Sequence, residues 1–217
     1  GVRQTLIGAL AGDALTTGDN NTAVGYNSLS AMTVGDRNVA VGVGTLAAAN
    51  VTTNADTYNT AVGFNAGNDI TTGVNNALIG GLAGDAFTDA DHNVAVGYQA
   101  LTSDTLGSRA VAIGQGALEN QNFTTATDNY NVGVGFHAGT AVTTGIRNTL
   151  LGGLAAQSAT TGQENTVVGY AALTTDTKGK RSVAVGNSAL QNQNFTTATD
   201  SYNVAVGFEA GIAVTTG

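Results

Sequence analysis

The chain has 217 residues, of which 42% are hydrophobic, 6% aromatic and 10% charged, and its formal net charge is −8. Its acidic balance argues against nucleic acid as a partner, and no apolar run reaches the roughly 18 residues of a membrane span, so we expect no membrane insertion. The absence of cysteine excludes a disulfide scaffold and a thiolate metal site.

One short phrase returns twelve times along the chain: a polar residue, a β-forming residue, a small residue, a large aliphatic residue and glycine. Successive glycines lie 17 residues apart, with every fourth spacing a longer one of 21. Such a period predicts an all-β parallel β-solenoid, or β-roll, of twelve rungs. We call these glycines the landmark glycines: Gly8, Gly25, Gly42, Gly63, Gly80, Gly97, Gly114, Gly135, Gly152, Gly169, Gly186 and Gly207.

Three longer units follow from the same spacing. Residues 1–217 form one repetitive segment, in which the units 1–72, 73–144 and 145–216 each contain three short rungs and one long rung. Gly217 occupies the same position of the 72-residue repeat as Gly1. We therefore expect a slice of a longer repetitive chain, or a unit that stacks end to end.

An asparagine stands four residues before nine of the landmark glycines. We expect a turn at this position, before each strand. Stacked identical amides can hydrogen-bond along the axis of a solenoid, so this column predicts a structural ladder. The asparagines are Asn21, Asn38, Asn59, Asn76, Asn93, Asn131, Asn148, Asn165 and Asn203.

The three residues before each landmark glycine form the predicted strand. The first and third, such as Val94 and Val96, share one face, and the small residue between them, such as Ala95, lies on the other. Both faces are apolar, so both need a cover. The opposite wall of the coil covers one. We expect the small-residue face to pack on another copy of the chain in a parallel cyclic oligomer, the alternative being a monomer with an exposed sheet.

A second strand is predicted by a threonine eight residues after the landmark glycine in short rungs and ten after it in long rungs. Each rung would then be strand, turn, strand, turn, and twelve rungs would make a rod of roughly 58 Å. The threonines are Thr16, Thr33, Thr52, Thr71, Thr88, Thr105, Thr124, Thr143, Thr160, Thr177, Thr196 and Thr215.

The extra residues of the long rungs are the candidate contact loops, at 50–58, 122–130 and 194–202. Insertions in solenoids project on one face and often carry binding, and aromatic rings there could stack on sugars. The alternative is that they fold back over the coil as local caps. The candidate surface-contact residues are Asn50, Asn122, Phe123, Tyr130, Asn194, Phe195 and Tyr202.

Nothing in the sequence indicates an enzyme, a cofactor or a metal site. The two histidines, His92 and His137, lie in one unit and recur in neither of the others, and no nucleophile motif stands out. Turn aspartates lack the glycine-rich repeat of calcium-binding solenoids, which favours hydrated carboxylates over Ca²⁺ ligands. These residues are Asp13, Asp85, Asp128 and Asp200.

The phrases Asn21-Thr-Ala-Val-Gly25, Asn93-Val-Ala-Val-Gly97 and Ser182-Val-Ala-Val-Gly186 resemble the head-domain repeat of trimeric autotransporter adhesins, and similar phrases occur in phage tail fibres. The resemblance implies a left-handed β-roll wound as a homotrimer, exposed on a cell surface, on a virion fibre or in a secreted filament. It implies an extracellular rod that attaches to a cell-surface glycan or to matrix. A purely structural self-assembling filament is the alternative function, and an ice-binding solenoid is a third.

Overall fold

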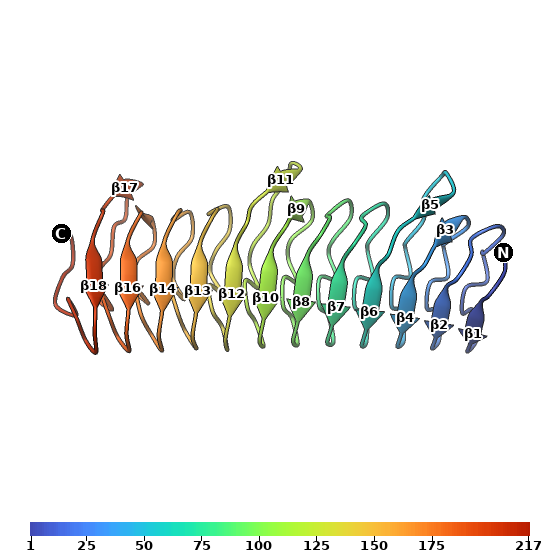
Figure 1. The fold of residues 1–217 in the computed structure, drawn as a ribbon, viewed down its shortest axis with the longest axis horizontal. Coiled ribbons are helices and arrows are strands. Elements are labelled where there is room, and N and C mark those ends of the chain that lie inside the picture. Colours follow the sequence, from blue (N-terminus) through green and yellow to red (C-terminus); the bar gives the residue numbers. More distant parts are fainter.

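The computed structural model describes all 217 residues and confirms an all-β parallel β-solenoid of twelve rungs. One parallel sheet runs its whole length, and each rung adds one three-residue strand that ends directly before a landmark glycine (Figure 1). The strands are β1 (Thr5–Ile7), β2 (Thr22–Val24), β4 (Val39–Val41), β6 (Thr60–Val62), β7 (Ala77–Ile79), β8 (Val94–Val96), β10 (Val111–Ile113), β12 (Val132–Val134), β13 (Thr149–Leu151), β14 (Thr166–Val168), β16 (Val183–Val185) and β18 (Val204–Val206).

In this sheet, residues at equivalent positions of successive sequence repeats pair with each other. Val94, Ala95 and Val96 of β8 pair with Val111, Ala112 and Ile113 of β10. The same alignment continues from β10 to β12, although a long rung lies between them. The extra residues of the long rungs therefore loop out without shifting the sheet.

The predicted second strand is absent. The only other strands are two-residue pairs that join each long rung to the rung before it, namely β3 (Gly35–Asp36) with β5 (Ala55–Asp56), β9 (Gly107–Ser108) with β11 (Thr127–Asp128), and β15 (Gly179–Lys180) with β17 (Thr199–Asp200). The rest of the second wall turns too tightly for a strand, because residues such as Leu101 and Leu118 take left-handed φ angles of 54° and 50°.

The threonine column is confirmed in the short rungs and wrong in the long ones. Thr71 and Thr88 stack, with the Thr71 N–H and Oγ1 both donating to the Thr88 carbonyl at 2.9 and 3.1 Å. In the long rungs asparagine takes this place, because the backbone keeps a constant eight-residue distance from the landmark glycine. Asn50, Asn122 and Asn194 therefore enter the column, while Thr52, Thr124 and Thr196 are exposed in the loops.

The two faces of the strand are the reverse of the prediction. Ala95 and its equivalents in β2 to β16 point into the coil and are fully buried, while Val94 and Val96 point outward and are half-buried. The small residues thus face the opposite wall, and the large β-branched residues face away from the molecule.

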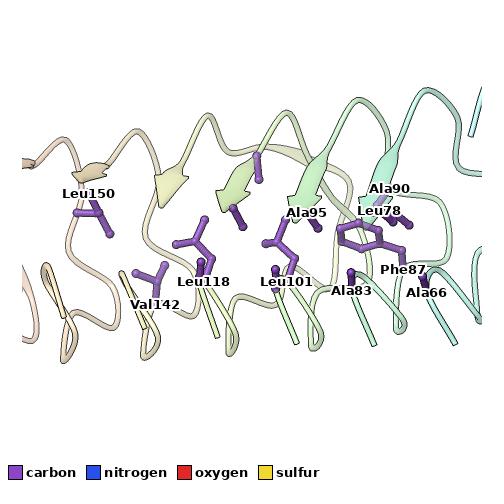
Figure 2. Packing of buried hydrophobic residues seen from close by; sticks show 14 of the residues in the cluster. Ala66, Leu78, Ala83, Phe87, Ala90, Ala95, Leu101, Leu118, Val142 and Leu150 are labelled. Carbon is purple, nitrogen blue, oxygen red and sulfur yellow. The ribbon is translucent and has the colours of Figure 1, made fainter. Parts of the chain in front are cut away.

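Volume complementarity between the two walls explains this choice. Five of the twelve rungs place Ala on the strand and Leu four residues after the landmark glycine, as with Ala95 and Leu101, which are both fully buried. Leu78 belongs to the buried cluster shown in Figure 2. Where the strand carries Leu78, the facing positions are Gly67 and Gly84, and a Cβ there would lie 2.7 and 3.0 Å from Leu78. The interior is therefore too thin for two large side chains to face each other.

The asparagine ladder is confirmed. The Asn148 Oδ1 accepts the backbone N–H of Asn165 at 3.1 Å, and the Asn148 Nδ2 donates to the carbonyl of Gly162 at 2.9 Å. The same pair of bonds recurs along the column, for example from Asn76 to Asn93. Ala110 interrupts the column, and there the Asn129 Oδ1 accepts the N–H of Asn131 at 2.9 Å.

Candidate contact surfaces

The long loops protrude at the edge of the sheet where the strands begin (Figure 1). Tyr130 and Tyr202 are exposed there, with 51% and 64% of their surface accessible. Phe123 and Phe195 are buried at 6% and 8%, so these two rings fold back into the coil as the alternative interpretation expects. The aromatic surface of the loops is therefore carried by tyrosine, to which Tyr58 of the first unit adds a third ring.

The three candidate asparagines of these loops connect neighbouring rungs. Each Oδ1 accepts a hydrogen bond from the threonine hydroxyl of the preceding rung, at 2.9 Å for Asn50 and 3.1 Å for Asn122 and Asn194. Their amides therefore begin the loops inside the threonine column and are not at the protruding tips.

An arginine of the preceding rung holds each loop. Arg109 contacts Asp128 at 2.9 Å, Arg181 contacts Asp200 at 2.5 Å, and Arg37 pairs with Asp56. Two of the guanidinium groups also lie over tyrosine rings, Arg37 at 5.5 Å from Tyr58 and Arg181 at 5.7 Å from Tyr202. Exposed ion pairs stabilise little, so we expect these contacts to orient the loops rather than to hold the fold together.

A polar cavity of about 390 Å³ lies beside the loop of the second unit. It has three carboxylates but no group of residues arranged to hold a metal ion. Its size is at the lower end for small-ligand sites. The lining residues are Asp89, Asp91, His92, Ser108, Arg109, Ala126, Thr127 and Asp128.

The turn aspartates named by the sequence do not converge. Asp128 and Asp200 pair with arginines of the preceding rungs, Asp85 accepts a hydrogen bond from the Thr102 hydroxyl, and Asp13 is exposed.

A buried carboxylate fixes the start of the second loop. The fully buried Asp104 uses Oδ1 to accept the backbone N–H groups of Gly107 and Phe123, both at 3.0 Å, and Oδ2 to accept Gln121 Nε2 at 2.6 Å. In the third unit Asp176 and Gln193 form the same pair. In the first unit the equivalent positions hold Met32 and Ala49, so both polar groups are replaced together.

Burial raises the pKa of the Asp104 carboxyl above 3.8, although the hydrogen bonds it accepts act in the opposite direction. The folded chain therefore holds this proton more tightly than the unfolded chain. The free energy of unfolding should fall as the pH rises from 3.8 through the folded-state pKa. We expect Asp104→Met with Gln121→Ala to remove this part of the pH dependence, as measured by chemical denaturation from acid to neutral pH.

The same substitutions test the coupling of the pair. Asp104→Met alone leaves three buried donors without an acceptor and should cost about 3 kcal/mol. Gln121→Ala should then cost less in that background than in the wild-type chain, because its partner is already gone. Equal costs in both backgrounds would contradict the assignment.

A column of exposed aromatic rings that the sequence-based predictions do not include lies at the opposite edge of the sheet. The strands run away from the long loops, so the residue after each landmark glycine lies at the far edge (Figure 1). In the sequence, an aromatic residue follows every second landmark glycine, so comparison of residues common to all rungs does not find the column. The aromatic members are Tyr26, Phe64, Tyr98, Phe136, Tyr170 and Phe208.

The threonine hydroxyls are engaged within the protein. Thr71, Thr88, Thr143 and Thr160 each donate Oγ1 to the threonine carbonyl of the next rung, at 2.9 to 3.2 Å. These hydroxyl protons therefore connect neighbouring rungs along the rod.

These features define the class as a repeat protein of the parallel β-solenoid type. The chain contains no helix that is long and apolar enough to cross a bilayer. Comparison with protein-family models, with curated proteins and with solved structures finds no match for this chain.

Proposed function

We propose that this chain is an extracellular rod segment that attaches to surfaces and works as a homotrimer, whose copies meet through the outward face of the sheet. The observation that carries the self-association is the uninterrupted neutral face of the twelve strands. None of the strand positions holds a charged residue, and the outward side chains are Val, Ile, Leu, Thr or Ala. Monomeric proteins rarely leave so continuous an apolar surface in water.

Two further features support a rod with an attachment role. Every rung is joined to the next by the sheet, and the asparagine ladder and the threonine column add further bonds along most of its length, so we expect the chain to be a stiff spacer. The tyrosine-bearing loops project from one edge, where a partner could reach them. The resemblance to adhesin heads and tail fibres agrees with this assignment, and a cell-surface glycan or matrix is the proposed partner.

Sedimentation velocity tests the self-association. We expect the wild-type chain to sediment as a trimer and Val168→Lys, on the outward face, to sediment as a folded monomer. Thr175→Lys is the matched control, because it adds the same charge to an exposed position of the same rung away from the sheet. A wild-type monomer over the accessible concentration range would contradict the oligomer.

Electron microscopy separates the rod from the alternative of a self-assembling filament. Discrete particles of uniform length are expected for an attachment segment, and continuous fibres would favour the filament. Binding of the chain to a glycan array or to immobilised matrix then tests attachment itself.

A further inference from the structure

The exposed aromatic rings recur at every second rung of the solenoid. All six follow a landmark glycine directly, and between 51% and 72% of each residue is accessible. The intervening rungs carry no aromatic residue at this position: Ala9, Val43, Gly81, Gln115, Gly153 and Asn187. Because strands in a sheet lie about 4.8 Å apart, the rings repeat at about 9.6 Å along the rod.

The glycines between the rings set how two of the rings lie. A Cβ on Gly81 would be 3.5 Å from Cδ2 of Tyr98, and one on Gly153 would be 3.5 Å from Cδ2 of Tyr170. Each tyrosine ring thus leans over the glycine of the preceding rung. These two rings therefore lie against the preceding rung rather than pointing freely into solvent.

The second residue after each landmark glycine also alternates between successive rungs. After an aromatic residue it is Asn27, Asn65, Gln99, His137, Ala171 or Glu209, so five of the six carry a hydrogen-bonding side chain. In the intervening rungs it is Leu10, Gly44, Leu82, Gly116, Leu154 or Ser188. The edge therefore presents an apolar ring beside a polar group once every two rungs, and the ring column itself contains no charge.

We propose that this edge, the aromatic row, binds an extended β-1,4-linked polysaccharide of the cellulose or chitin type that lies parallel to the rod. The inference rests on the proposed attachment function and names its target. Pyranose rings present a C–H face that packs on aromatic rings, while their hydroxyl groups need hydrogen-bonding partners at the side. Successive sugars of such a chain are turned over, so that it repeats every two sugars, and each sugar advances by a length close to one rung.

Rigidity makes many weak contacts effective together. Six rings are held on one straight edge, so a polymer that contacts one ring is already aligned with the next. A flexible or helical polysaccharide, such as an α-linked glucan, cannot keep this alignment. The row should therefore distinguish extended β-linked polymers from starch.

Retention on insoluble cellulose and chitin, with starch granules as the control matrix, tests the proposal. We expect the wild-type chain to bind cellulose or chitin and not starch, and Tyr98→Ala with Phe136→Ala to weaken binding at least about tenfold.

Val43→Ala with Gln115→Ala is the matched control, because it truncates two exposed side chains at the same position of rungs without a ring and should leave binding unchanged. Tyr58→Ala with Tyr130→Ala is the loop variant, which removes two exposed rings from the long-loop edge. Circular dichroism verifies that each variant is folded.

Each other outcome overturns the inference in a recognisable way. If the wild-type chain binds neither matrix, the aromatic row has another role, and attachment to other surfaces is judged by the glycan array alone. If the loop variant loses binding and the row variant keeps it, attachment stands but is carried by the long loops. If the row variant sediments with fewer subunits than the wild type, the row is a contact between copies of this chain.

Discussion

Replacing Gly80 with alanine is expected to lower the free energy of unfolding by about 3 kcal/mol or more. Gly80 has a φ of +137°, a region that residues with a Cβ avoid. Its Cβ would lie 2.5 Å from the carbonyl oxygen and 2.6 Å from the carbonyl carbon of Gly97 in the next rung. Relief would require the two rungs to separate, which would strain the bond from the Gly97 N–H to the Ile79 carbonyl, now 2.8 Å long.

Two neighbouring substitutions separate the causes of this loss. Gly81→Ala should be nearly neutral, because Gly81 lacks a left-handed φ and its Cβ would make ordinary contacts, with the Tyr98 ring at 3.5 Å and the Phe64 carbonyl oxygen at 3.9 Å. Gly207→Ala keeps the conformational cost at φ +130° without the close approach, because its nearest contact would be Ala210 at 3.9 Å, so we expect an intermediate loss. Chemical denaturation gives the order of the three, and hydrogen exchange shows whether the damage stays in the flanking rungs. Equal effects of Gly80→Ala and Gly81→Ala would refute the close-packing argument.

Loss of one ladder amide is expected to be nearly as damaging. Asn148→Ala should cost about 3 kcal/mol, because the Asn165 N–H and the Gly162 carbonyl each lose their partner in a buried site. Thermal unfolding measures this loss. The exposed Asn187, whose side chain bonds only to the adjacent Ser188, is the control, and Asn187→Ala should change stability little.

Ala110 offers a second comparison, because the chain itself tolerates a missing amide there. The Asn129 Oδ1 supplies the acceptor that the ladder lacks, at 2.9 Å from the Asn131 nitrogen. Asn129→Ala should therefore be costly even though Asn129 lies outside the ladder column. A neutral result would show that the ladder bonds contribute little, and would count against the expected loss at Asn148 as well.

The two candidate contact surfaces lie at opposite edges of one apolar sheet face. The tyrosine loops stand where strands begin, the aromatic row stands where they end, and the outward aliphatic columns lie between them. A trimer built on the sheet face and a polysaccharide bound at one edge are thus separate proposals, and the loop, row and Val168 variants test them independently.

Two repeating columns were read correctly from the sequence, whereas the threonine column was placed correctly only in the short rungs. The landmark glycines gave the rung period and the register, and the asparagine column gave the ladder, because identical side chains at a constant spacing have one simple way to stack. Residues that repeat only in alternate rungs were missed, and the aromatic row is the main example. The sequence left open whether the loop phenylalanines face outward or fold back, because an insertion does not indicate which of its rings is buried.

The amino-acid sequence by itself therefore determined a parallel solenoid of twelve rungs in register, since period and column identity suffice for that. Only the tertiary structure decided which strand face is internal, because Ala95 and its flanking valines are all apolar and polarity cannot choose between them. The choice depends on volume: the leucines of the opposite wall leave room for alanine, and leucine enters the strand only where glycine faces it. The tertiary structure also placed Asn50, Asn122 and Asn194 in the threonine column, because the backbone path of the sheet is kept and the added residues leave it as a loop.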